Sequence, residues 1–503
     1  MQNKKYLLTL SSLFLLCACA PTEAKTLQTF DTEVDRFGVH RNANCFFGAP
    51  CLDSIGTKPI LVIPVSFADA EPFSEEDMAK LNAAYTGEEG ETGFFSLSEF
   101  YKQSSYGKLN LDITILDPIV SDVYSDIFAF QYTVSSQALA DFLNQIVDQC
   151  KASGLDSMKY DVDNDGYLDA VHLIYKNKDN VIWSGQQDMT KVWWSYTDVD
   201  PNDPNKDDPQ PGIYFWSAFS QLETEFYAPG IDTHTLIHET GHTLGLDDYY
   251  SYYSDEDGSP LGGVDMMDLA SGDHNAVSKS LLGWVNPFVP SKEDEELEIT
   301  LHDFQSTGEC LALVNHDSWN GNAYGEYFML EYYTPTGLNK PDAEKPVAAH
   351  IGKLGNGDKI YQNPGLKVIH ADTRLSVIRD VDGKSTTKGF TTSFEAESPD
   401  YVTISQSNTS TSSLSGHRLM EIIPANGQNM YGKYGNPYGN FGNQATLFGK
   451  SEYGCGSDKF DELTCAKIMR NRTKMNDGST IPYVFEVTAQ NDSEITLLVH
   501  KNA

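Results

Sequence analysis

The chain has 503 residues, of which 40% are hydrophobic and 12% aromatic, so it is long enough to bury one or two substantial cores. Its formal net charge of −37 argues against nucleic acid and against an anionic membrane surface as partners. Such a charge suits a secreted protein that attracts divalent cations, although an acidic, solvated surface is the simpler explanation.

The first nineteen residues are typical of a signal peptide. Two lysines precede an apolar run at residues 6–16, which is too short to span a membrane as a mature helix. The run ends in Leu-Cys-Ala-Cys and resembles a bacterial lipoprotein signal that is cut before Cys19. Lipidation of Cys19 would anchor the protein to an outward-facing membrane and would be its only membrane contact. Plain secretion after a cut at Ala20, or a retained N-terminus, is the alternative.

Residues 20–57 are interpreted as an extended leader or propeptide-like segment. The region that follows, 58–290, has mixed patterns, with strands predicted at 60–67, 109–115 and 170–175 and helices at 75–84, 136–151 and 232–244. Residues 200–212, rich in Asp, Asn and Pro, are predicted to form a solvated insertion loop.

An acidic loop in this region has the spacing of a calcium site. Oxygen ligands fall at positions 1, 3, 5, 7 and 9 of an EF-hand-like loop, supplied by the side chains or, at position 7, the carbonyl of Asp161, Asp163, Asp165, Tyr167 and Asp169. Position 12 is His172 instead of Glu, and a strand is predicted after the loop, so a true EF-hand is excluded. We predict a compact structural calcium turn; an acidic turn without metal is the alternative.

The string His-Glu-Thr-Gly-His at 238–242 predicts a zinc site. Histidines four apart on a helix rise by about 6 Å and rotate by about 40°, so His238 and His242 point from one face toward one ion. Glu239 could then take a proton from a water that the metal has made more acidic and pass it to the leaving amine. The residues therefore indicate a zinc peptidase.

The motif continues through Gly245 to Asp248. A left-handed Gly245 would end the helix and return Asp248 as the third metal ligand. The bare HExxH string is expected by chance in roughly one chain in a hundred of this length, and the added Gly and Asp lower this to about one in ten thousand. A capped surface helix with two solvated histidines is the alternative.

Residues 262–268, Gly-Gly-Val-Asp-Met-Met-Asp, place two methionines after a glycine-rich turn. Zinc peptidases with the extended motif carry such a Met-turn, in which a methionine packs beneath the histidines. A methionine pair that simply fills the core is the alternative.

Together these motifs resemble the immune-inhibitor-A-like zinc metallopeptidases, peptidase family M6, of the metzincin type. The similarity also covers 61–69, 96–109, the acidic loop, 327–332 and 365–372, and it extends more weakly over most of 58–500, although only the zinc motif and Met-turn are highly specific. It implies an α+β fold with a metzincin-like zincin catalytic core at 58–290 and a β-rich C-terminal region at 291–503. The alignment selects Met267 as the Met-turn methionine and Asp248 as the third ligand. The family usually has Pro in place of Asp247, a departure that leaves the Asp248 position intact.

Beyond residue 291 the pattern is strand-like, as at 483–487 and 495–499, while 384–416 is rich in Ser and Thr and is predicted to include flexible loop. Glu331, His370 and Asp372 lie in the family-like strands, and His274 follows the Met-turn. Buried polar groups satisfied by their neighbours are the simplest interpretation of all four.

Six cysteines follow Cys19, and an even number in an exported protein permits disulfides: Cys45, Cys51, Cys150, Cys310, Cys455 and Cys465. Cys45 with Cys51, and Cys455 with Cys465, are close enough to close small local loops. No CxxC pair exists, which argues against zinc binding by these thiols. In an alternative interpretation, Cys45 of the leader ligates the catalytic zinc and keeps the enzyme latent.

We therefore expect a secreted or surface-anchored zinc endopeptidase with Glu239 as general base, structural calcium, and protein or peptide substrates. The alternative is a catalytically silent, calcium-stabilised surface lipoprotein that binds a host or matrix protein. The intact Glu239 argues against that alternative, because a binding protein has no need of the base. A serine hydrolase is not expected, since the sequence lacks a GxSxG elbow.

Overall fold

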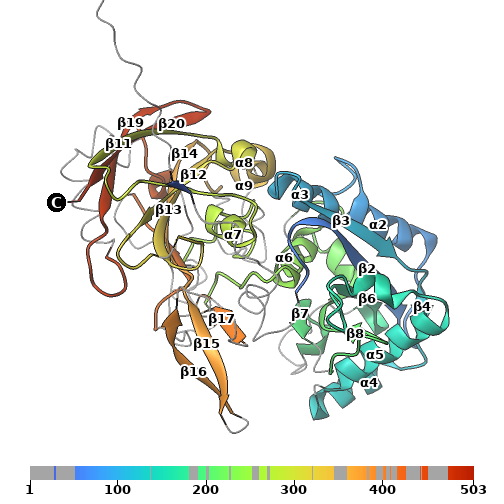
Figure 1. Cartoon of the computed structure of the whole chain (residues 1–503). Helices are drawn as coiled ribbons and strands as arrows, with labels where there is room; N and C mark the ends of the chain where they lie inside the picture. The colour runs from blue at the N-terminus through green and yellow to red at the C-terminus, as the bar shows by residue number, and fades with distance from the viewer. Residues whose placement is uncertain are drawn as a thin grey trace, which may run out of the picture.

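The protein was analysed as a computed structural model, which describes residues 28–29, 51–135, 137–180, 191–199, 203–225, 228–251, 260–268, 272–319, 321–344, 359–381, 384–391, 400–403, 408, 416–425, 442, 444–450 and 474–502. It has an N-terminal α/β part, drawn in blue to green, and a β-rich part, drawn in yellow to red, with α6 and α7 between them (Figure 1). The fold is thus mixed α/β and compatible with the predicted α+β class.

The N-terminal part is built on a twisted sheet. Its strands are β2 (Gly56–Ser66), β3 (Leu109–Ile115), β4 (Ile119–Val120), β6 (Val171–Lys176), β7 (Tyr196–Val199) and β9 (Ile213–Ala218). Their order is β3-β2-β6-β9-β7, with β4 beside β2. All neighbours pair in parallel except β7, which runs antiparallel to β9 at the end of this order. The three strands predicted here are confirmed.

Helices cover both faces of this sheet. Ile60 and Val62 of β2 pack in the same cluster as residues of α2 (Glu75–Thr86), α3 (Leu97–Ser104) and α6 (His234–Thr243). The alternate residues Leu61 and Ile63 pack with α4 (Ser125–Val134) and α5 (Gln137–Ala152). A parallel sheet buried on both faces needs such a continuous apolar strand. The bounds of α2, α5 and α6 confirm the predicted helices to within two residues.

Among its described residues, the C-terminal part holds three sheets. The largest has the order β1-β10-β12-β13-β14-β18, from β1 (Gln28–Thr29), β10 (Phe288–Val289), β12 (Cys310–Val314), β13 (Glu326–Tyr333), β14 (Gly365–Asp372) and β18 (Met420–Ile422). The second, β11-β20-β19, comprises β11 (Glu296–His302), β20 (Glu494–Lys501) and β19 (Tyr483–Gln490). The third, β16-β15-β17, comprises β16 (Lys384–Thr391), β15 (Leu375–Val381) and β17 (Asp400–Thr403). The predicted β-rich character and the two last strands are confirmed.

The large C-terminal sheet separates two cores. On β13, Phe328 and Leu330 pack with side chains of β11, β19 and β20. Their neighbours Tyr327 and Met329 pack instead with α6, the Met-turn and α7 (Ala276–Leu281). Side chains alternate across a strand, so one sheet supplies both cores. The second of these cores is the one that also contains α2, α3 and one face of the N-terminal sheet.

Two strands lie close to the boundaries that were predicted at residues 57 and 290. The leader was expected to reach residue 57, but β2 begins at Gly56, and Leu52 N–H already donates to Thr243 O (3.0 Å) at the end of the zinc helix. The boundary at 290 follows β10, which pairs with β12 and therefore belongs to the C-terminal sheet. Long-range sheet pairing, which leaves no local signal, fixes both ends.

Two predicted loops contain strands. Residues 210–211 of the insertion loop form β8 (Gln210–Pro211), which pairs in parallel with β5 (Tyr167–Leu168) within the acidic loop. Strands β16 and β17 lie inside the Ser/Thr-rich stretch that was predicted to include flexible loop. Thr and Ser tolerate strand geometry well when a partner strand is available, which the composition alone does not reveal.

The even number of cysteines permitted disulfides, and the described cysteines include both bonded and free ones. Cys51 is disulfide-bonded, whereas Cys150 and Cys310 are free and buried. Cys19, Cys45, Cys455 and Cys465 lie outside the described residues, as does the predicted signal peptide.

In the part of the chain that the structure describes, no helix combines the length and apolar character needed to cross a membrane.

Candidate metal centre

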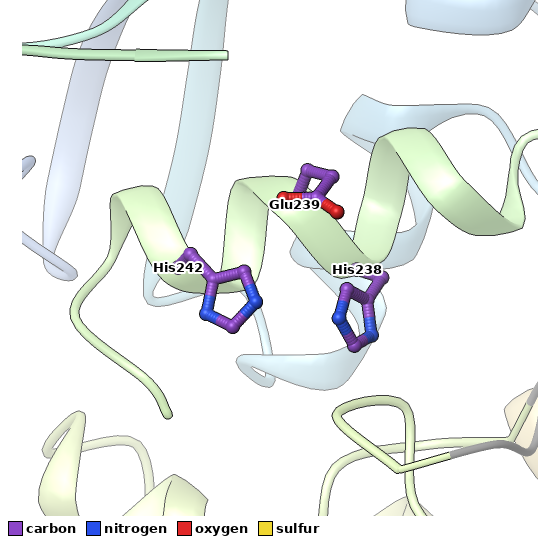
Figure 2. A group of neighbouring side chains, drawn as sticks. All are labelled: His238, Glu239 and His242. Carbon is purple, nitrogen blue, oxygen red and sulfur yellow. The ribbon is translucent and has the colours of Figure 1, made fainter. Parts of the chain in front are cut away.

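The zinc motif lies on α6, which is buried from Leu236 to its last residue, Thr243. The rings of His238 and His242 lie side by side on one side of this helix, with their centroids 5.0 Å apart, and Glu239 is on the turn between them (Figure 2). Because one helical turn separates the two histidines, their rings approach each other without any distortion of the helix. The predicted shared face is confirmed.

Backbone carbonyls set the orientation of both rings. His238 Nδ1 lies 2.7 Å from Met266 O, and His242 Nδ1 lies 2.7 Å from Leu246 O. A carbonyl oxygen can only accept, so each Nδ1 carries a proton and donates it. The Nε2 atom of each ring is consequently left to face Asp248, as in histidines that bind a metal through Nε2.

Asp248 completes the set of donor atoms. Gly245 has φ +93°, in the left-handed region, and turns the chain after α6 as predicted. Asp248 Oδ1 then lies 3.0 Å from His238 Nε2 and 3.3 Å from His242 Nε2. Tetrahedral ligands about 2.1 Å from one zinc ion are about 3.4 Å apart, so this spacing fits zinc. The neighbouring Asp247 is also buried, but it is Asp248 whose carboxylate meets both histidines.

Charge coupling within the centre is strong. Burial lowers the pKa of His242, but the negative charge of Asp248 more than offsets this and raises the pKa to about 10. Burial would raise the pKa of Asp248, yet His242 and His238 hold it well below its usual range. A divalent cation bound here would take the place of the Nε2 protons between these groups, because a histidine binds a metal through a deprotonated nitrogen.

Glu239 lies beside this cluster without being part of the His-Asp contacts. Its side chain is buried, and a carboxylate oxygen lies within 4.8 Å of a ligand nitrogen on each histidine. Burial raises the pKa of Glu239, and Asp248 adds to this, while the two histidines oppose it. Its main-chain carbonyl accepts a hydrogen bond from Thr197 Oγ1 of β7 (2.9 Å). A more basic carboxylate at this position is suited to accept a proton.

The Met-turn lies directly against α6. A Cβ at Gly241 would be only 2.4 Å from Met267 Sδ, so the sulfur occupies the space that a side chain at this helical position would need. Met266 contributes its carbonyl, which holds His238, and Met267 O accepts the N–H of Tyr249 (2.8 Å). Met267 therefore packs against α6 at Gly241, one residue before His242, and Met266 has a role that the sequence did not reveal.

Two further residues of this region were missed. Asp265 Oδ1 accepts the Met267 N–H (2.8 Å), and Asp265 Oδ2 accepts both N–H and Nδ2 of Asn275 (2.8 and 2.7 Å). Asn275 in turn caps α7 through Val277 and Ser278. This buried network fixes the Met-turn to α7. Only the Asx-type pattern of the turn residues could have indicated it.

The C-terminal sheet supports α7 through a buried ion pair. Glu331 Oε2 accepts the N–H of Ala276 (2.6 Å), the first residue of α7, and Glu331 Oε1 lies 2.6 Å from Lys367 Nζ. Glu331 and Lys367 are directly opposite on β13 and β14. Glu331 is thus a buried polar group satisfied by its neighbours.

The other polar residues singled out in the sequence lie away from the metal ligands. His370 Nε2 is 2.9 Å from Glu326 Oε1, and its ring stacks on Phe328. Asp372 binds Arg374 Nε and Nη2 (2.7 and 2.6 Å). His274 is enclosed by aromatic rings, including those of Phe100, Tyr101 and Trp284. His370 and Asp372 thus have polar neighbours, as the simplest interpretation held, whereas neither ring nitrogen of His274 has a hydrogen-bond partner among the described residues.

The acidic loop brings three of its predicted ligands together. Carboxylate oxygens of Asp161, Asp163 and Asp165 lie within 4.8 Å of one another. Main-chain N–H groups of Asp165 and Gly166 donate to the two oxygens of Asp161 (3.0 Å each), and Asp169 Oδ2 accepts the N–H of Val162 (2.8 Å). The loop leads into strands β5 and β6, which agrees with the prediction that no EF-hand helix follows.

Gly166 allows this loop to approach the insertion loop. It has φ +99°, and a Cβ here would lie 2.7 Å from Asn205 N. The Asn205 N–H donates to Gly166 O (3.1 Å). A side chain at position 166 would therefore separate the two loops as well as strain the turn. His172, the twelfth position, is buried on β6 with Nδ1 3.0 Å from Tyr85 Oη, and burial lowers its pKa to about 3.

No protein-family model and no curated protein matches the chain. The resemblance to M6 peptidases therefore remains an expectation from the sequence motifs.

Proposed function

We propose that the protein is a zinc-dependent endopeptidase with a metzincin-like catalytic part, similar to the M6 peptidases, that hydrolyses peptide bonds of proteins. One observation is the main support for this proposal. Asp248 Oδ1 lies 3.0 Å from His238 Nε2 and 3.3 Å from His242 Nε2. Zinc held by these three residues would make a water more acidic and polarise the scissile carbonyl.

Glu239 is assigned the role of general base and acid. Its buried carboxylate has a raised pKa and lies close to both histidines, so it can accept the proton that the attacking water loses. It then gives that proton to the amine nitrogen that leaves when the C–N bond breaks, which restores the carboxylate for the next turnover. The hydrogen bond from Thr197 and the packing of α6 hold the helix turn that carries Glu239.

A polypeptide substrate suits the surroundings of the site. Among the described strands, β7 is at the edge of the N-terminal sheet and pairs with β9 on one side. It also contacts α6, because Thr197 Oγ1 donates to Glu239 O. The edge of a strand can add an extended peptide through main-chain hydrogen bonds. Such pairing would place a peptide beside the zinc helix independently of its sequence.

We assign a structural calcium site to the acidic loop, with Asp161, Asp163 and Asp165 as ligands and with Tyr167 O and Asp169 as further ligands. The main-chain bonds to Asp161 hold the loop in a compact turn, so little rearrangement is needed to bind the cation. We also propose that the enzyme acts outside the cell, either secreted or anchored through Cys19.

The proposal is tested on the purified full chain by zinc analysis together with casein cleavage, with and without a chelator. We expect about one zinc per chain, cleavage that the chelator abolishes and zinc restores, and a loss of at least ~100-fold in Glu239→Gln, which keeps zinc. A wild-type protein that binds zinc but cleaves no polypeptide, or a Glu239→Gln variant with near-normal turnover, would refute it. The first result would favour the silent binding lipoprotein.

A further inference from the structure

Asn408 lies in the C-terminal part between β17 and β18, yet it contacts the chain at the third metal ligand. Its main-chain N–H donates to Asp248 O (3.0 Å), and its Nδ2 donates to Tyr249 O (3.1 Å). Nδ2 also donates to Met420 O (2.6 Å), and Oδ1 accepts the N–H of Met420 (3.1 Å). The side chain is fully buried. Asn408 therefore fastens two consecutive carbonyls of the ligand segment to the first residue of β18.

The ligand segment, residues 244–249, depends on such contacts. It includes the left-handed turn at Gly245, and other bonds to it include those from His242 Nδ1 to Leu246 O and from the Tyr249 N–H to Met267 O. Both of these come from the zinc helix and the Met-turn. Asn408 adds a contact to the main chain of Asp248 from a different part of the chain, the stretch between β17 and β18.

We propose that Asn408 is a positioning residue for the metal centre, and this inference rests on the proposed zinc site. By fixing the carbonyls of Asp248 and Tyr249, it sets where Asp248 Oδ1 meets the Nε2 atoms of His238 and His242. Residues that hold a ligand in place commonly change metal affinity by about 10- to 100-fold when they are removed. The β-rich part thereby contributes directly to the zinc site.

The chemistry of the contacts explains why Asn is required at this position. Its side chain must donate two hydrogen bonds, to Tyr249 O and Met420 O, and accept one from the Met420 N–H. Aspartate would accept but not donate, and would face two carbonyl oxygens with a negative charge. Alanine would leave all three buried main-chain groups without these partners.

The test compares Asn408→Ala with Asn322→Ala in the full chain. Asn322 is a matched control, because it is also a buried asparagine of the C-terminal part, and its Oδ1 accepts the N–H of Tyr324 (2.8 Å) instead of binding the ligand segment. We expect Asn408→Ala to lower zinc affinity by about 10- to 100-fold in competition with a chelator. The control should stay within about threefold of wild type. Cobalt-substituted Asn408→Ala should show altered visible absorption bands, which report ligand geometry.

A double-mutant cycle with Asp248→Ala separates positioning from general destabilisation. If Asn408 acts through Asp248, then Asn408→Ala should change zinc affinity by less than about threefold in the Asp248→Ala background. Should Asn408→Ala fail to fold, Asn408→Ser keeps one donor and should show a smaller loss of the same sign. Equal losses in the Asn408 and Asn322 variants, or an undiminished further loss in the Asp248→Ala background, would overturn the proposal. Wild-type protein that binds neither zinc nor cobalt would instead overturn the zinc site itself.

Discussion

Replacement of Gly241 by alanine tests directly how the packing of α6 against Met267 supports the proposed metal centre. On helix propensity alone, Gly241→Ala would stabilise α6 by about 1 kcal/mol. The added Cβ, however, would lie 2.4 Å from Met267 Sδ and 3.1 Å from Met267 Cε, and Met267 is fully buried. A carbon and a sulfur atom need roughly 3.6 Å or more, so the methionine has to move by more than about 1 Å inside a packed core.

Overpacking of this kind typically costs about 1–3 kcal/mol, and a displaced Met-turn would also shift Met266 O, which holds His238. We therefore expect Gly241→Ala to lower both the free energy of unfolding and zinc affinity, as measured by urea denaturation and chelator competition. Met267→Ala in the same chain makes room for the new methyl group, so the double variant should be more stable than the sum of the single changes predicts. A more stable Gly241→Ala protein, or strictly additive effects, would show that the sulfur does not limit this position.

Three further predictions follow from the site and its surroundings. Asp248→Ala should lose most of its zinc affinity while Asp247→Ala keeps zinc and activity, and the reverse ranking in zinc titrations would show that the Gly245 turn presents the wrong carboxylate. Removal of calcium while zinc is retained should lower the melting temperature, and Asp163→Ala should abolish this sensitivity; an unchanged melting point would indicate an empty acidic turn. For His370, burial lowers the pKa, but the bonds to Glu326 and Glu421 raise it to about 9. Relative to about 6.5 in the unfolded chain, it should contribute up to about 3 kcal/mol below pH 6.5, a contribution lost as the pH rises to 9, and His370→Gln should flatten this part of the stability curve.

The predicted elements that proved correct have local signals. Strands β2 and β6 are continuous apolar runs, and α6 carries a compact motif whose ligand spacing is fixed by the helical repeat. Gly245 could be assigned its turn because only glycine adopts that φ without strain. The shared face of His238 and His242 and the position of Glu239 next to them were therefore predictable from a few adjacent residues.

The supports of the site were not predictable, because their signals are not local. Met266 acts through its carbonyl, which every residue has, and Asn408 lies in a Ser/Thr-rich stretch whose composition indicates a loop. Ser54, which precedes residue 58, is held by hydrogen bonds with the distant Leu282 and Trp284, which the local sequence does not reveal. Burial of Glu331 and Lys367 as a pair likewise follows from strand register, which the sequence alone does not determine.

The single hydrophobic core that spans the N-terminal part and the large C-terminal sheet has a consequence for how the protein unfolds. Tyr327 and Met329 of β13 are fully buried against the same cluster that contains Met267 and Leu236 of α6. If the two parts separated, both would expose apolar surface that water does not tolerate, so neither should melt alone. We expect one cooperative transition in calorimetry for the full chain, and aggregation of any fragment that stops near residue 290.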